Sequence, residues 1–131
     1  MRACKERVNG FDPSYLFTLR DLKRLARRAR EALSLRDLPA VARVLSASWE
    51  ANKRIHPSTT NDEVEELLGR VAGLYGGMKL LGAGGGGYIL FLSESIEQAD
   101  RLRHVLSSIE HERARVVEMT LNPVGLQVSV S

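Results

Sequence analysis

The sequence GMKLLGAGGGGYILFL occupies residues 77–92. Five of the six residues from Gly82 to Gly87 are glycines, which lose more backbone freedom on folding than any other residue. Such a run indicates a loop in which side chains must be absent, because the backbone takes positive φ or because another group approaches it closely. Successive exposed N–H groups also form a concavity that favours anions such as phosphate. The short apolar segment Met78–Leu81 precedes the loop, and Tyr88–Leu92 after it predicts a buried strand.

The spacing of these glycines admits several interpretations. Gly82 to Gly87 satisfies G-x-G-x-x-G, but a dinucleotide-binding fold needs that motif between a strand and a helix, and here a strand follows. A Walker A loop needs Gly-Lys-Ser/Thr after the glycines, and Tyr88 stands there instead. Two interpretations remain: a plain hairpin loop without a ligand, and a loop that supports a phosphate site. We favour the second, because the glycine run is costly to order.

Three helices are predicted before this segment. Apolar residues at steps of three and four indicate an amphipathic helix over about 14–34. Asp37 is the predicted N-cap of a second helix, which His56-Pro57 ends because the residue before proline disfavours helical φ/ψ. Thr60 to Glu63 has the spacing of a capping box for a third helix that runs to Tyr75.

The remainder of the chain is predicted to be one helix and two strands. Ser93 or Ser95 caps the helix, which ends near Glu110. Strands are predicted at 116–121 and 126–130, with a turn at 122–125 between them. The resulting order, α-α-α-β-β-α-β-β, is typical of the α+β class.

Length and composition place the chain among ordinary globular proteins. Its 131 residues suit one domain, and the formal net charge is +3. No apolar run approaches the roughly 20 residues that a membrane span needs, and residues 1–10 lack the apolar stretch of a signal peptide. Cys4, the single cysteine, excludes an internal disulfide. We therefore expect a cytoplasmic protein without a membrane partner.

The basic residues gather near the N-terminus. Residues 1–36 hold ten Lys/Arg and four Asp/Glu, whereas residues 37–131 hold nine and twelve. A basic helix face can mark a nucleic-acid partner. No aromatic residue is interleaved among these cations to stack on bases. We therefore interpret them as a solvated helix face and expect no nucleic-acid partner.

The segment GMKLLGAGGGGYILFL resembles the third conserved motif of the GHMP kinase superfamily, the small-molecule kinases of galactose, homoserine, mevalonate and phosphomevalonate. Segments 49–53, 113–119 and 125–129 are similar to the C-terminal end of L-fucokinase-type proteins, including bifunctional fucokinase/GDP-fucose pyrophosphorylases. The related D-glycero-D-manno-heptose 7-phosphate kinases share the first of these segments and the glycine loop. The resemblance covers nearly the whole chain from about residue 15.

The resemblance implies a ferredoxin-like GHMP kinase C-terminal domain, an antiparallel sheet with helices on one face. In the family, ATP and sugar bind between two domains, and this glycine loop lies beside the phosphate loop of the other domain. The site-forming residues implied by the motif are Gly82, Ala83, Gly84, Gly85, Gly86 and Gly87.

Three further residues are candidates for binding. Lys79 beside the loop is a candidate to attract phosphate, although a lysine in an edge strand also discourages aggregation. Asn52 and Lys53 are candidates to face the sugar, because an asparagine on an apolar stripe needs a polar partner. A polar contact at the end of the helix is the alternative. Trp49 is expected in the core, and the three histidines share no metal-ligand spacing.

Two parts of the family pattern are missing from this sequence. The Pro-x-x-x-Gly-Leu-x-Ser-Ser-Ala phosphate motif and the carboxylate that acts on the sugar hydroxyl belong to an N-terminal domain that is absent here. No catalytic residue or metal ligand is therefore assigned, and ATP and Mg²⁺ are expected to bind mainly to that domain. The family's first strand is also not found in residues 1–13, which we expect to be poorly ordered. Its loss would leave unpaired strand edges, which favours a homo-oligomer or a strand rearrangement.

The predicted function is that of the C-terminal part of an ATP-dependent sugar kinase that phosphorylates L-fucose at its anomeric hydroxyl. The expected partners are the N-terminal kinase domain and the sugar, and the chain alone is expected to be inactive. A D-glycero-D-manno-heptose 7-phosphate kinase is the alternative within the family. A non-catalytic orphan interaction module is the alternative from another class.

Overall fold

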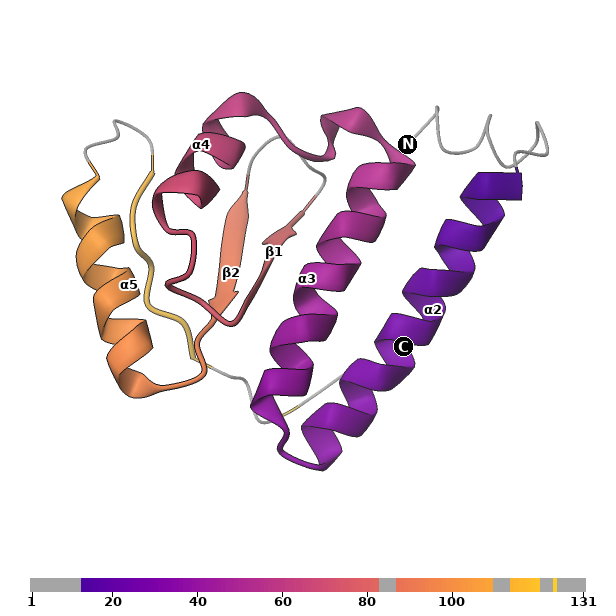
Figure 1. Cartoon of the computed structure of the whole chain (residues 1–131), viewed down its shortest axis with the longest axis horizontal. Coiled ribbons are helices and arrows are strands. Elements are labelled where there is room, and N and C mark those ends of the chain that lie inside the picture. The colour runs from indigo at the N-terminus through magenta and orange to yellow at the C-terminus, as the bar shows by residue number, and fades with distance from the viewer. Residues whose placement is uncertain (1–12, 83–86, 110–113, 121–123, 125–131) are drawn as a thin grey trace, which may run out of the picture.

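The computed structural model of the chain describes residues 13–82, 87–109, 114–120 and 124. The elements of this described part are, in order, α2 (Pro13–Ser34), α3 (Leu38–Ile55), the 3-10 helix η1 (Pro57–Thr59), α4 (Asp62–Arg70), β1 (Gly77–Leu81), β2 (Tyr88–Leu92) and α5 (Ile96–Ser108). Helix α2 packs along α3, and α3 lies beside β1 on the side away from β2 (Figure 1). The predicted α+β class is confirmed.

The helix ends follow from local capping. The Asp37 carboxylate accepts a hydrogen bond from the Ala40 N–H at 2.9 Å, which confirms it as the N-cap of α3. His56 ends that helix in an extended conformation, as its position before proline predicts. Ser95 accepts from the Gln98 N–H at 3.1 Å, which identifies Ser95, not Ser93, as the N-cap of α5.

Helix α4 is shorter than predicted at both ends. Its N-cap is Asn61, whose side chain accepts from the Val64 N–H at 2.9 Å. The helix ends at Arg70, so the predicted extension to Tyr75 is wrong. The chain turns at Gly73, where φ is +79°, and this left-handed conformation cannot continue an α-helix.

Strands β1 and β2 form an antiparallel hairpin in which Met78 pairs with Phe91 and Leu80 pairs with Ile89. These four side chains share one face of the sheet, because side chains alternate along a strand. Trp49 of α3 joins them in the core with 2% of its surface exposed. The other helical members of that cluster are Val64 and Leu68 of α4. Helices therefore cover one face of the hairpin, as predicted.

The outer edge of β1 is covered by α3. The Met78 N–H donates to the Ser46 hydroxyl at 3.2 Å. A Cβ atom on Gly77 would overlap the backbone carbonyl of Ala42. The helix and the strand thus approach so closely that only glycine fits at residue 77. The bond to Ser46 also gives the buried Met78 N–H a partner that it would otherwise lack.

The C-terminal strand predicted at 116–121 is wrong over its described residues. Residues 114–120 have no regular secondary structure and are exposed. A strand requires a neighbouring strand that pairs its N–H and C=O groups, and in the described ranges the sheet consists of β1 and β2 alone. The predicted strand 126–130 lies outside the described residues, as do residues 1–12.

Substituting Gly77 by alanine should destabilise the fold, because the added methyl group would collide with the α3 backbone. We expect Gly77→Ala to lower the free energy of unfolding by about 3 kcal/mol, the upper range for overpacking. The matched control is Gly69→Ala in α4, where a Cβ meets nothing within 4 Å. This control should gain about 0.5–1 kcal/mol from helix propensity. Urea unfolding followed by circular dichroism measures both, and equal stabilities would contradict the close approach.

Candidate functional site

The turn between β1 and β2 is flanked by two glycines in conformations that other residues rarely adopt. The φ angle is +115° at Gly82 and +117° at Gly87. A Cβ on Gly87 would lie 2.6 Å from the carbonyl oxygen of Leu81. The turn therefore needs glycine at both flanks for its own geometry, which is the first of the two explanations that the sequence left open. The loop residues implied by the motif that lie between them, Ala83, Gly84, Gly85 and Gly86, fall outside the described residues.

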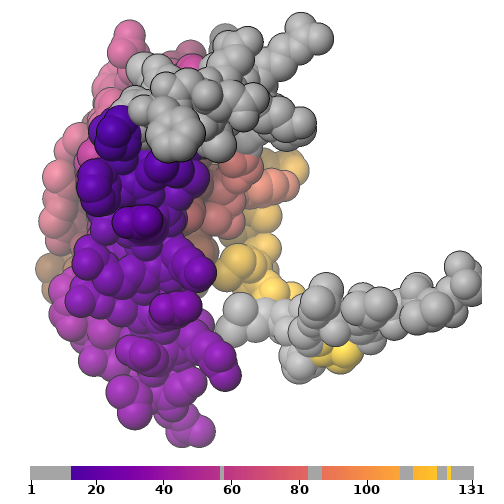
Figure 2. Space-filling view, turned by 90° about the vertical axis from the view of Figure 1, so that its right-hand side faces the viewer, coloured from indigo at the N-terminus to yellow at the C-terminus, as the bar shows by residue number. Residues whose placement is uncertain are grey.

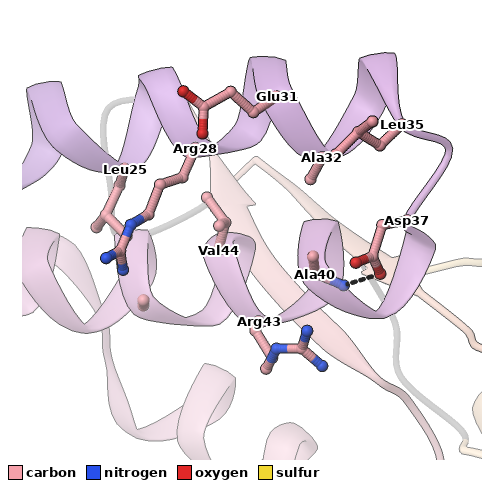
Figure 3. Close-up of a pocket in the computed structure, with 10 residues that line it drawn as sticks. Leu25, Arg28, Glu31, Ala32, Leu35, Asp37, Ala40, Arg43 and Val44 are labelled. Carbon is pink, nitrogen blue, oxygen red and sulfur yellow. Dashed lines mark hydrogen bonds between the residues drawn. The ribbon is translucent and has the colours of Figure 1, made fainter.

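The described residues on both sides of the hairpin turn are open to solvent. Gly82 and Gly87 are both exposed, as are the flanking Leu81 (39%) and Tyr88 (66%). The tip lies at the same end of the molecule as the C-terminal end of α3, which carries Asn52 (Figure 1). The hollow that the structure shows lies elsewhere, between α2 and α3 (Figure 3). The described residues thus provide two exposed flanks of the turn rather than an enclosed pocket.

Lys79 is half-buried on β1, and its ammonium group is directed to α3. Its Nζ donates to the Ser48 hydroxyl at 2.7 Å. Burial lowers the pKa of Lys79 below 10.5, because desolvation penalises the charged form. The folded chain therefore binds this proton less tightly than the unfolded chain. The Lys79 contribution to stability rises as pH increases from the lowered pKa towards 10.5.

Lys53 is held by two carboxylates at the end of α3. Its Nζ lies 2.8 Å from an oxygen of Glu50 and 3.8 Å from an oxygen of Glu65 on α4. The hydrogen bond with Glu50 raises the pKa of Lys53, against an opposing effect of desolvation. The ammonium also lies 5.7 Å from the ring centroid of Trp49. Lys53 thus makes a polar contact at the end of the helix. This contact was the alternative to facing the sugar that the sequence left open.

Asn52 is half-buried, and its backbone closes the end of α3. Its carbonyl oxygen accepts from the His56 N–H at 3.3 Å and from the Thr59 hydroxyl at 3.2 Å. These bonds satisfy a carbonyl of the last helical turn, which has no partner within the helix. Asn52 and Lys53 belong to the last turn of α3, and this end of α3 lies at the same end of the molecule as the end of β1 and the start of β2 (Figure 1). Among the described residues, no hydrogen bond or ion pair joins either of them to the flanks of the glycine turn.

Sequence reasoning missed Ser46 and Ser48, the two α3 residues that bind β1. Ser46 accepts from the Met78 backbone and Ser48 from the Lys79 side chain. The signal that could have found them is their position between the apolar residues Leu45 and Trp49. A small hydroxyl side chain beside the apolar stripe of a helix can form hydrogen bonds with the edge of a neighbouring strand.

Among the residues that the structure describes, no cluster of three or more His, Cys, Asp or Glu residues could hold a metal ion. The described helices also include none long and apolar enough to cross a membrane. The described site therefore offers two exposed glycines, Gly82 and Gly87, at the flanks of the turn, and two lysines that are engaged elsewhere. This arrangement fits the close approach of a phosphate group to the backbone.

The chain is similar to one known protein family and to several proteins of known name. Residues 29–111 match the family model described as GHMP kinases C terminal. The chain is 35% identical over 118 residues to an L-fucokinase/L-fucose-1-P guanylyltransferase of Bacteroides fragilis, covering 89% of this chain and 12% of that protein. It is 33% identical over 95 residues to a bifunctional fucokinase/GDP-fucose pyrophosphorylase of Arabidopsis thaliana, covering 72% of this chain and 9% of that protein.

A third relative is a D-glycero-alpha-D-manno-heptose 7-phosphate kinase of Campylobacter jejuni, 27% identical over 118 residues. That match covers 88% of this chain and 33% of the kinase. The chain thus spans about an eighth or less of the first two relatives and a third of this one. No solved structure is significantly similar to the chain.

Substitution of Gly87 by alanine should cost more stability than the same change at another glycine with positive φ. At Gly73 φ is +79° and a Cβ meets nothing within 4 Å, so alanine should cost about 1 kcal/mol of backbone strain. At Gly87 the overlap with the Leu81 carbonyl is added, and the expected cost is about 3 kcal/mol. Urea unfolding of Gly87→Ala and Gly73→Ala measures the difference. Equal costs would show that the turn does not require a bare backbone at residue 87.

Proposed function

Because the chain belongs to the family of GHMP kinase C-terminal domains, we propose that it forms the C-terminal domain of an ATP-dependent sugar kinase. The proposed substrate is L-fucose, phosphorylated at its anomeric hydroxyl. The observation that carries the proposal is the pair of exposed glycines with positive φ, Gly82 and Gly87, that flank the glycine run. The choice of sugar is supported by the higher identity to the two relatives named as fucokinases than to the heptose 7-phosphate kinase.

The proposed role of the turn follows from the demands of phosphoryl transfer, which depends on positioning and on stabilising the charge of the moving group. A backbone without side chains at Gly82 and Gly87 lets the phosphate-binding loop of an N-terminal domain approach closely. Backbone N–H groups of the turn would donate to phosphate oxygens there and lower the cost of bringing negative charge to the site. Bound ATP supplies the transferred group, and Mg²⁺ spreads its developing charge.

The other candidate residues take supporting roles in this proposal. Lys79 adds positive charge to the strand that leads into the turn, while its bond to Ser48 fixes the side chain. Asn52 and Lys53 lie at the end of α3 that is proposed to be nearest the sugar. When the sugar binds, Lys53 leaves its contact with Glu65, at 3.8 Å, and contacts the sugar instead. Main ATP and Mg²⁺ ligands belong to the N-terminal domain, so the chain alone is inactive. The protein acts in the cytoplasm.

Two other functions have specific observations in their favour. A heptose 7-phosphate kinase is supported by the match over 88% of this chain. An orphan interaction module is supported by the two-stranded sheet of the described part, whose β2 edge has no partner strand there. In that case a homo-oligomer would form through exposed strands, because an open edge pairs readily with another chain.

Transplanting the chain into its relatives tests the function directly. Residues 13–131 replace the matched segment in the B. fragilis fucokinase and, separately, in the C. jejuni heptose 7-phosphate kinase. We expect the first chimera to phosphorylate L-fucose with at least about a tenth of the parent kcat. The second should lose about a hundredfold for heptose 7-phosphate. Coupled ADP assays measure both.

The matched control in the first chimera is Gly87→Val against Gly73→Val. Both change a glycine with positive φ, but only residue 87 borders the proposed phosphate site. Gly87→Val should lower kcat/KM for ATP about tenfold more than Gly73→Val. Folded chimeras without activity on either sugar would instead favour the orphan module.

A further inference from the structure

A groove of about 420 Å³ lies between α2 and α3, close to the turn that joins them (Figure 3). Its walls include Ala32 of α2 and Ala40 and Ala47 of α3, which leave space where larger residues would interdigitate. Leu25 and Val44 complete an apolar floor. The groove can therefore accept one large apolar side chain from outside.

The groove continues into an exposed apolar surface around the α2–α3 turn. Leu33, Leu35 and Leu38 there are 59%, 79% and 49% exposed. Scattered exposed leucines are ordinary, but three within six residues beside an open groove form a contiguous patch. Such a patch at the rim of a groove is typical of an interaction surface.

The charged groups at the groove favour an acidic occupant. Arg28 extends from α2 across the gap towards α3, and Arg43 lies on α3 (Figure 3). Both are exposed, and neither forms an ion pair with a residue of the described part. The Asp37 carboxylate is engaged by the Ala40 N–H. Glu31 of α2 also lines the groove, and its carboxylate lies beside α2 near Arg28 in Figure 3.

The wider charge distribution points the same way. Residues 13–55, which contain α2 and α3, hold ten Lys/Arg and four Asp/Glu. Residues 56–131 hold six and ten. Residues 13–55 therefore carry a formal charge of +6, and residues 56–131 carry a formal charge of −4. Complementary charge steers association and rejects partners of the wrong sign.

We propose that the groove between α2 and α3 docks an acidic amphipathic helix of a partner protein. One large apolar side chain of that helix fills the alanine-lined hollow, and carboxylates one turn away face Arg28 and Arg43. A third helix suits this place, because ridges of a helix pack into the groove between two others. The exposed leucines of the α2–α3 turn extend the apolar contact.

This surface is separate from the glycine turn. Ala40 and Asn52 are twelve residues apart on α3, which is about 18 Å along a helix axis. The α2–α3 turn and the hairpin tip lie at opposite ends of the molecule (Figure 1). Helix α2 forms the near face of the view in Figure 2, which shows that no other described element covers it there. The groove is therefore distinct from the proposed kinase site.

A fluorescein-labelled synthetic peptide of 18 residues tests the proposal, with leucines at helical spacing, one central phenylalanine and glutamates elsewhere. Fluorescence anisotropy at 150 mM salt measures its Kd for the full chain. Arg28→Glu and Arg43→Glu should each weaken binding about tenfold. Ala47→Trp fills the groove at an exposed position without changing charge, and should weaken binding to a similar degree.

The matched control is Arg27→Glu, the same charge change on α2 at a residue that does not line the groove. It should change Kd less than about threefold, because solvent and salt screen an outer-face charge. A peptide with serine in place of its apolar residues should lose binding. No binding of the acidic peptide below 1 mM would overturn the proposal. Equal losses for Arg27→Glu and Arg28→Glu, with tighter binding of random duplex DNA, would assign the basic helix to nucleic acid instead.

Discussion

The packing of α3 against the outer edge of β1 is the contact on which the other features rest. Gly77 permits it, because any side chain there would meet the Ala42 carbonyl. Ser46 satisfies the Met78 N–H, which faces away from β2. A two-stranded hairpin is marginal by itself, and its open edge would expose unpaired backbone groups. The helix therefore covers this edge of β1 much as an additional strand would.

This contact also relates the two functional surfaces to each other. Helix α3 extends from the groove at its N-terminal end to Asn52 near the glycine turn at its other end. Trp49 and Met78 lock the middle of the helix to the sheet within the same core cluster. A kinase site that closes between two domains needs its contributing loop held rigidly. In the proposed kinase, the α3–β1 contact would hold the strand that leads into this loop.

Much of the fold could be predicted because the relevant signals are local. The caps at Asp37 and Ser95, and the proline after His56, each act within four residues. The end of α4 was missed because Gly73 takes its left-handed turn before the apolar pattern that runs to Tyr75 is complete. The strand at 116–121 was predicted from composition, but strand formation depends on a pairing edge that composition does not reveal.

The same difference between local signals and contacts made by packing applies to the candidate site. Positive φ, found at Gly82 and Gly87, was one of the two explanations that the sequence left open for the glycine run. The engagement of Lys79 by Ser48 and of Lys53 by Glu65 joins residues distant in sequence, so no local pattern contains it. The groove between α2 and α3 also depends on the relative position of two helices. Such contacts become visible only once the elements are packed.

Amide hydrogen exchange at Met78, read by NMR, tests the central contact most directly. If α3 covers the edge of β1, the Met78 amide of the intact chain should be protected as well as other amides of the hairpin. Ser46→Ala should then accelerate its exchange about tenfold, the loss of one hydrogen bond. Exchange of Met78 as fast as that of the exposed residues 114–120, or no response to Ser46→Ala, would contradict this account of the structure.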